Sequence, residues 1–172
     1  MTSSQKAEEN ILGESSNRVV LNAAKDYLHH IESLTKQSSR IIQIYSDDLP
    51  HVLFESQEIA DAFSQFARGN RHSNIQILLK DTRVLIQSRI PLLLLNNRIS
   101  AIKIRKADES YNFGDQTILL FDHTAIMEKP TPDSHAGLVC YSDRAKVRTQ
   151  SQLFSEYWER SSEDPNIRDQ LI

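Results

Sequence analysis

The stretch Asp115-Gln-Thr-Ile-Leu-Leu-Phe-Asp122 decides how the rest of the chain is interpreted. Its centre is a run of apolar and β-branched residues, which predicts a buried strand over 116–121. An aspartate stands at each end of the stretch, and a polar loop over 106–112 precedes it. We therefore expect a strand inside a sheet, with acidic side chains where the strand begins and ends.

Five further segments share the composition of strands: residues 40–45, 74–80, 100–105, 125–128 and 137–141. Apolar residues three or four positions apart predict helices in other segments: residues 17–37, 57–68 and 91–98, and a long final helix that starts at Arg144. Ser56 is expected to cap the second helix and Pro91 to stand in the first turn of the third. Phe154 and Trp158 are expected to pack on the sheet.

Strands that alternate with helices, followed by a run of strands and one more helix, predict an α/β fold. We expect a mixed, mostly parallel sheet of about six strands with helices on both faces. A plain doubly wound sheet is the alternative. Residues 1–16 are polar and predict a flexible leader, residues 17–162 form a single domain, and residues 163–172 form a short acidic tail.

Composition excludes several classes of protein. The 172 residues carry 20 Lys and Arg against 23 Asp and Glu, a net charge of -3, so the chain lacks the overall basic excess of a dedicated nucleic-acid binder. Its 4 glycines are scattered and form no phosphate-binding loop, and its 1 cysteine forms no internal disulfide. No signal peptide and no membrane-spanning apolar run are found, which predicts a cytoplasmic protein that does not bind a membrane.

The histidines and the cysteine give weak signals for catalysis. His29 and His30 are adjacent on a predicted helix, point in different directions and are expected on its solvated face. His51 and His72 lack acidic or cysteine partners at ligand spacing, so we expect no metal and no cofactor. Cys140 lies within a predicted buried strand and is interpreted as a small apolar residue rather than a reactive thiol.

Aspartates follow two of the predicted strands, where open α/β sheets place ligand sites. Asp47 and Asp48 follow the first of these strands and Asp81 the second. The alternative is that these carboxylates form turns or cap helices, and we favour that interpretation.

Basic residues gather at two places and suggest an anion site. One group surrounds the strand that ends at Arg105, and the other, with Arg144 and Lys146, starts the final helix. Cations at a helix N-terminus oppose the helix dipole, which makes the second group unusual for a purely structural role. His123 directly follows a strand and is the most suggestive histidine. We therefore name His123, Arg105, Arg144 and Lys146 as candidate anion-binding or ligand-binding residues.

The order of segments, the strand that ends in Asp122 and the final helix with Phe154 and Trp158 resemble one lobe of the phospholipase D-like superfamily. Members of that superfamily carry a His-x-Lys-x4-Asp motif on this strand. Aligning Asp122 with the Asp of the motif puts Asp115 in place of the histidine and Thr117 in place of the lysine, so the motif is degenerate here. The chain is also similar to an uncharacterised bacterial family of such lobes, sometimes associated with acetyltransferase domains.

The resemblance implies a fold that often works in pairs and a catalytic site that is lost. An aspartate at 115 cannot act as the histidine nucleophile, and Thr117 brings no charge to offset a phosphate. We therefore expect no catalytic residue, and a homodimeric binding or protein-interaction module. The alternatives are a phosphodiesterase or nuclease with a rearranged site, a partner of an acetyltransferase, and a protein that binds the phosphate backbone of nucleic acid.

Overall fold

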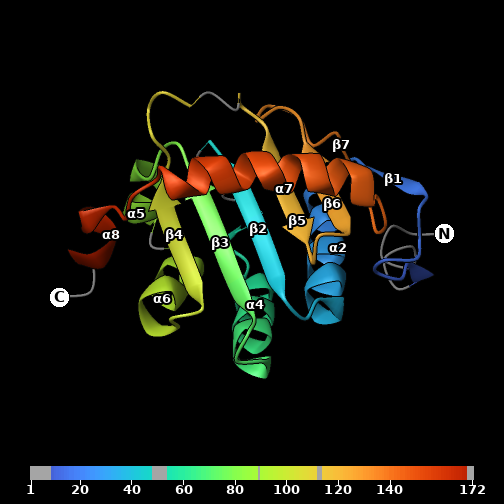
Figure 1. Cartoon of the computed structure of the whole chain (residues 1–172), viewed down its shortest axis with the longest axis horizontal. Helices are drawn as coiled ribbons and strands as arrows, with labels where there is room; N and C mark the ends of the chain where they lie inside the picture. Colours follow the sequence, from blue (N-terminus) through green and yellow to red (C-terminus); the bar gives the residue numbers. More distant parts are fainter. Residues whose placement is uncertain (1–8, 48–53, 89, 112–113, 170–172) are drawn as a thin grey trace.

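The computed structural model describes residues 9–47, 54–88, 90–111 and 114–169 (Figure 1). A seven-stranded sheet runs through the domain in the order β1-β7-β6-β5-β2-β3-β4. The strands are β1 (Arg18–Leu21), β2 (Ile41–Ser46), β3 (Asn74–Leu79), β4 (Ile102–Lys106), β5 (Thr117–Phe121), β6 (Ala125–Lys129) and β7 (Gly137–Cys140).

The expected number and direction of the strands were wrong. The sheet has seven strands rather than about six, and only the pairs β2–β3 and β3–β4 are parallel. The other four pairs are antiparallel. Helical connections carry the chain from β2 to β3 and from β3 to β4, which allows parallel pairing, whereas a tight turn joins β5 to β6 and forces an antiparallel hairpin.

The extra strand, β1, lies where we expected the first helix to begin. Its side chains alternate across the sheet, because Val19 and Leu21 are buried whereas Val20 is 61% exposed. Val20 stands four residues before Ala24, a spacing that also fits a helix, so apolar periodicity alone predicts a helix here. The helix itself, α2 (Ala24–Gln37), starts later, and Leu34 lies on its buried face.

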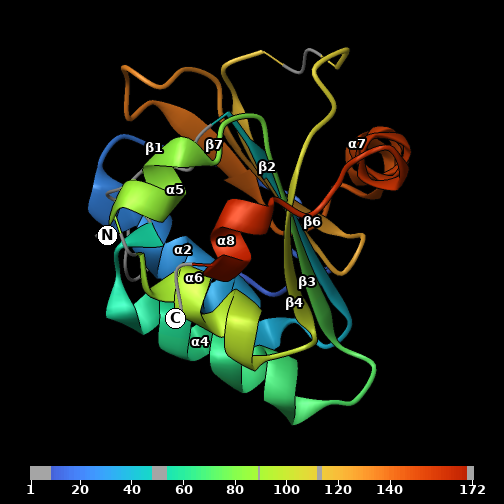
Figure 2. The same cartoon turned by 90° about the vertical axis from the view of Figure 1, so that its left-hand side faces the viewer.

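Among the described residues, the sheet is flanked by α2, α4 (Gln57–Gly69), α5 (Arg83–Ser88), α6 (Pro91–Arg98), α7 (Arg144–Glu159) and α8 (Pro165–Asp169). Figure 2 shows the sheet edge-on, with α7 on one side and α2, α4, α5, α6 and α8 on the opposite side. Two predicted signals are confirmed. The Ser56 hydroxyl accepts the backbone N–H of Ile59 at the start of α4, and Pro91 stands in the first turn of α6.

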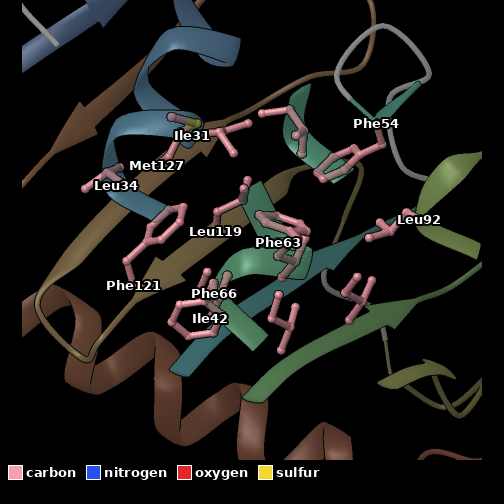
Figure 3. Packing of buried hydrophobic residues seen from close by; sticks show 14 of the residues in the cluster. Ile31, Leu34, Ile42, Phe54, Phe63, Phe66, Leu92, Leu119, Phe121 and Met127 are labelled. Carbon is pink, nitrogen blue, oxygen red and sulfur yellow. The ribbon is translucent and has the colours of Figure 1, made fainter. Parts of the chain in front are cut away.

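Each face of the sheet has its own core. On the α2 and α4 side, residues such as Ile42, Phe63 and Leu119 pack together (Figure 3). On the α7 side, Phe154 and Trp158 join Tyr45 against the sheet, as expected. The Phe154 and Trp158 rings are stacked with their centroids 5.7 Å apart.

Both ends of the described chain are bonded to the domain. In the predicted leader, the N–H of Gly13 donates to the Tyr141 carbonyl at 2.8 Å, and the N–H of Leu12 donates to the Gln37 side chain. In the predicted tail, α8 buries Ile167 in the core. Within the described ranges, no helix is both long and apolar enough to cross a membrane.

Candidate functional site

The candidate residues lie at the two ends of β5. Asp115 and Thr117 stand at the start of the strand, and Asp122 and His123 follow its end. Five strand residues span about 17 Å. The residues aligned with the superfamily motif therefore do not converge on one point.

The first end of β5 is closed by hydrogen bonds. Thr117 is 4% exposed, and its hydroxyl oxygen lies 2.7 Å from the hydroxyl oxygen of Ser46 at the end of β2. Asp115 is exposed in the turn before the strand. The position aligned with the motif lysine thus holds a small neutral side chain that is already paired with its neighbour.

A lysine does lie beside Thr117, on the neighbouring strand. Lys129 of β6 pairs in register with Thr117 and is 5% exposed. Its ammonium donates to the carbonyl oxygens of Thr131 and Pro132 at 2.5 and 3.1 Å. These bonds hold the charge against the loop that follows β6, so Lys129 does not offer a free cation to a phosphate.

At the other end of β5, the Asp122 carboxylate is a structural anchor. It accepts the backbone N–H groups of Ser39, Arg40 and Ile41 at 2.7, 2.8 and 2.9 Å. Hydrogen bonds to a charged acceptor are stronger than those between neutral groups. The carboxylate therefore fixes the start of β2 to the β5–β6 turn.

The β5–β6 turn holds Asp122 and His123 in an uncommon conformation. Their φ angles are 49° and 57°, and the N–H of Thr124 donates to the Phe121 carbonyl at 3.0 Å. Two successive positive φ values define a type I′ turn, which most side chains disfavour. Because Asp122 is tied to β2, the turn stays in this conformation and His123 projects toward α7.

The start of α7 is attached to the same turn. The N–H of Asp143 donates to the Thr124 carbonyl at 2.8 Å, and the Asp143 carboxylate accepts the N–H of Lys146 as the helix cap. These bonds bring α7 beside His123. The pocket between them has a volume of about 670 Å³, and we call it the α7 groove. It is lined by His123, Arg144, Arg148, Ser151, Gln152, Ser155 and Glu156.

A chain of hydrogen bonds connects the groove to the sheet. Gln43 donates its amide N–H to the Gln76 carbonyl oxygen at 3.1 Å and accepts the Ser151 hydroxyl at 2.9 Å. Ser151 Oγ lies 3.3 Å from His123 Nδ1. Because the only hydroxyl proton of Ser151 is donated to Gln43, Ser151 accepts from His123. The neutral imidazole thus carries its proton on Nδ1 and leaves Nε2 without one.

The structure brings together only two of the four predicted anion-binding residues, His123 and Arg144. Arg105 lies over the Trp158 ring, with its guanidinium carbon 4.5 Å from the ring centroid, and donates to the Trp158 carbonyl. Lys146 forms an ion pair with Glu128 at 2.6 Å. Both cations are therefore engaged in contacts outside the groove.

The sequence candidates His30, Cys140 and Asp81 make contacts within the fold and do not line the α7 groove. His30 is fully buried, not solvated as expected, and its Nδ1 lies 2.8 Å from the Tyr141 hydroxyl. Cys140 is buried, as expected, and forms no disulfide. Asp81 binds the backbone and guanidinium of Arg83, and these hydrogen bonds lower the pKa of its carboxyl to about 2, which supports a turn-forming role.

Two of the sequence candidates, Asp48 and His51, lie outside the described residues. Asp47 contributes its backbone carbonyl, which accepts the N–H of Asp81 at 2.7 Å. In the part of the chain that the structure describes, no three His, Cys, Asp or Glu side chains gather as a metal site would require.

Sequence reasoning missed the polar residues that support the groove. Gln43 and Gln76 each interrupt an apolar strand, and they pair in register on β2 and β3. A polar side chain inside a buried strand requires a polar partner. The need of Gln43 for a polar partner is the signal that could have identified Ser151, which occupies a buried position of α7 among aromatic residues.

Comparison with known proteins adds a family and several structural relatives. The family described as Domain of unknown function (DUF7931) matches residues 23–170. A search of curated protein sequences finds no match.

Three solved structures share the fold at low sequence identity. NucT from Helicobacter pylori has a TM-score of 0.63 at 11% identity over 86% of this chain and 99% of that one. Nuc from Salmonella typhimurium, a phospholipase D family member, has a TM-score of 0.58 at 10% identity, with the same coverage. TrmBL2, an archaeal chromatin protein with a novel mode of DNA binding, has a TM-score of 0.61 at 17% identity, covering 88% of this chain but 55% of its own. The fold is thus phospholipase D-like.

Proposed function

The chain belongs to the DUF7931 family, and we propose that it is a phospholipase D-like domain that binds a partner without hydrolysing phosphodiesters at the motif positions. The proposal assigns this chain the phospholipase D-like fold without the phosphodiesterase chemistry that the motif resemblance implies. The protein partner and the cytoplasmic location expected from the sequence belong to the same proposal.

One observation carries the proposal: the Thr117 hydroxyl is buried against Ser46 where the motif would place a lysine. Catalysis of phosphoryl transfer depends on stabilising the charge that develops on the phosphate oxygens. Thr117 offers no positive charge, and the nearby Lys129 ammonium is bound to two carbonyl oxygens. Asp115 adds a carboxylate, which repels a phosphate and cannot form the covalent intermediate of a histidine nucleophile.

A hydrolysis assay tests the absence of activity. We expect the purified chain to release no 4-nitrophenol from bis(4-nitrophenyl) phosphate above the rate of a buffer control. Asp115→Asn and Thr117→Val variants should give the same background rate. A rate above background that is lost in either variant would overturn the proposal, because it would place chemistry at these two positions. Asp133→Asn, an exposed loop carboxylate, is the matched control.

The alternative of a phosphodiesterase with a rearranged site has less support. It requires the Asp122 carboxylate and His123 to act in one cleft, but that carboxylate is bound to three backbone N–H groups of the β2 start. His123 itself lines the α7 groove with Arg144, which supports a binding role for this histidine. Nucleic acid is therefore kept as a candidate ligand of the groove, not as a substrate.

The homodimer expected from the resemblance is also proposed. Size-exclusion chromatography with light scattering at tens of micromolar chain should give twice the mass of one chain. A single-chain mass at that concentration contradicts the dimer and leaves the binding role open.

A further inference from the structure

We propose that the α7 groove binds the phosphate group of a ligand through Arg144, Arg148 and His123. This inference rests on the proposed binding function and names the chemistry of the ligand. It concerns the end of β5 opposite to Asp115 and Thr117 and the other face of the sheet, since Thr117 alternates with Leu119 and Phe121 on the α2 side whereas Ser151 lies on the α7 side.

The arginine pair is the first observation behind the proposal. Arg144 and Arg148 are one helical turn apart on α7, where like charges repel and lower helix stability. The first turn of α7 contains no acidic residue, so its two cations, Arg144 and Lys146, oppose the helix dipole. Glu128 offsets Lys146, but within the described ranges neither arginine forms an ion pair. A bound anion would offset both charges.

The composition of the groove is the second observation. All seven residues that line it are polar or charged, and Gln152 adds amide donors to those of the arginines. Arginine matches the oxygens of a phosphate with two parallel N–H donors. The one carboxylate, Glu156, lies about 12 Å from Arg148 along the helix axis, so it leaves the arginine end positive.

The orientation of His123 is the third observation. Its turn is tied to β2 through Asp122, and its Nδ1–H donates to Ser151, which the sheet holds through Gln43. The ring is therefore fixed before any ligand arrives. Within the described part of the chain, Nε2 makes no hydrogen bond, so this nitrogen is available to a phosphate oxygen when it is protonated or to a P–OH group when it is not. Fixed donors lower the cost of ordering the site on binding.

Binding measurements with three probes test the proposal on the full chain. We expect inorganic phosphate, adenosine monophosphate or an eight-residue oligothymidylate to bind the wild type in isothermal titration. An Arg144→Gln/Arg148→Gln variant should bind the same probe at least about tenfold more weakly. Arg98→Gln, which removes a charge on α6 across the sheet, is the matched control and should bind as the wild type does. Thermal melting of each variant verifies that it is folded.

The three probes distinguish a small phosphorylated ligand from a nucleic-acid backbone. Equal affinity for adenosine monophosphate and the oligonucleotide indicates a small phosphorylated ligand. Tighter oligonucleotide binding, with a steep fall in affinity as salt rises, indicates a nucleic-acid backbone. No binding of any probe, or equal binding by the wild type and the double variant, overturns the proposal. That failure is distinct from failure of the proposed lack of hydrolysis, which the 4-nitrophenol assay tests.

Discussion

Asp122 and His123 are adjacent residues whose side chains serve different purposes. The Asp122 carboxylate holds three N–H groups at the start of β2, and His123 projects toward α7. Aspartate and histidine are among the few side chains that tolerate positive φ, which explains how this turn forms without glycine. Asp122 therefore has a structural role, and it positions the neighbouring histidine.

His30 leads to a pH-dependent prediction. Burial lowers the pKa of its imidazole from 6.5 to about 4, against a smaller opposing effect of the Asp26 charge. The unfolded chain therefore takes up a proton between these pH values that the folded chain does not. The free energy of unfolding is retained above pH 6.5 and falls as the pH is lowered toward 4. From pH 7.5 to pH 5 we expect His30 to account for a loss of about 2 kcal/mol.

Urea unfolding of the wild type and of His30→Gln at both pH values measures this contribution. The variant should lose about 2 kcal/mol less than the wild type over the same interval. His72→Gln, at an exposed histidine, should behave as the wild type does. Equal losses in the wild type and in His30→Gln would show that His30 does not titrate as its burial implies.

At the scale of elements, strands that are rich in apolar residues could be predicted from the sequence. Short elements, and whether neighbouring strands run parallel or antiparallel, could not. Residues 116–121, 40–45 and 74–80 correspond to β5, β2 and β3 within one residue or two. Four-residue β1 was missed because Val20 fits a helical period as well as a strand period. Its pairing with β7 is decided by a distant segment, and local patterns carry no information about that partner.

The start of β7 gives an element-scale prediction. A Cβ at Gly137 would overlap the Tyr27 hydroxyl of α2 and the backbone carbonyl oxygen of Glu128 on β6. We expect Gly137→Ala to lower the free energy of unfolding by about 3 kcal/mol or more, because the neighbouring strand has to move. Thermal and urea unfolding measure the loss.

Two further variants make this prediction specific. Adding Tyr27→Phe to Gly137→Ala should not restore the wild-type stability, because the contact with the Glu128 carbonyl remains. Gly69→Ala is the matched control, since nothing lies within 4 Å of a Cβ there, and it should raise stability by up to about 1 kcal/mol. Wild-type stability of Gly137→Ala would mean that β6 and β7 are not packed as described.

At the scale of the whole molecule, segments far apart in sequence complete the core. Ile167 of α8 is 3% exposed, and the Thr82 hydroxyl donates to the Asp164 carboxylate at 2.5 Å. We expect Ile167→Ala to lower the free energy of unfolding by about 2–4 kcal/mol, measured in urea. Ile11→Ala, at a residue that is 51% exposed, should change it by less than about 0.5 kcal/mol. Equal effects of the two variants would contradict the packing of α8.

The candidate site could be predicted only in part, because contacts between distant segments decide which charged side chains line it. The sequence pointed to His123 and Arg144, which the structure brings together, but also to Arg105 and Lys146, which bind Trp158 and Glu128 instead. Charge and position in the sequence are visible without a structure. Which charges are already paired depends on contacts between strands and helices that are distant in the chain.

The pairing of β1 with β7 also has a consequence during synthesis. Leu21 pairs with Gly137, so β1 leaves the ribosome long before its partner strand exists. At about 5–20 residues per second, the nascent chain carries this strand unpaired for on the order of ten seconds. Val19 and Leu21, buried in the finished domain, are then accessible to chaperones. Because β1 is an edge strand whose one partner is β7, it can join the sheet only after β7 has been synthesised.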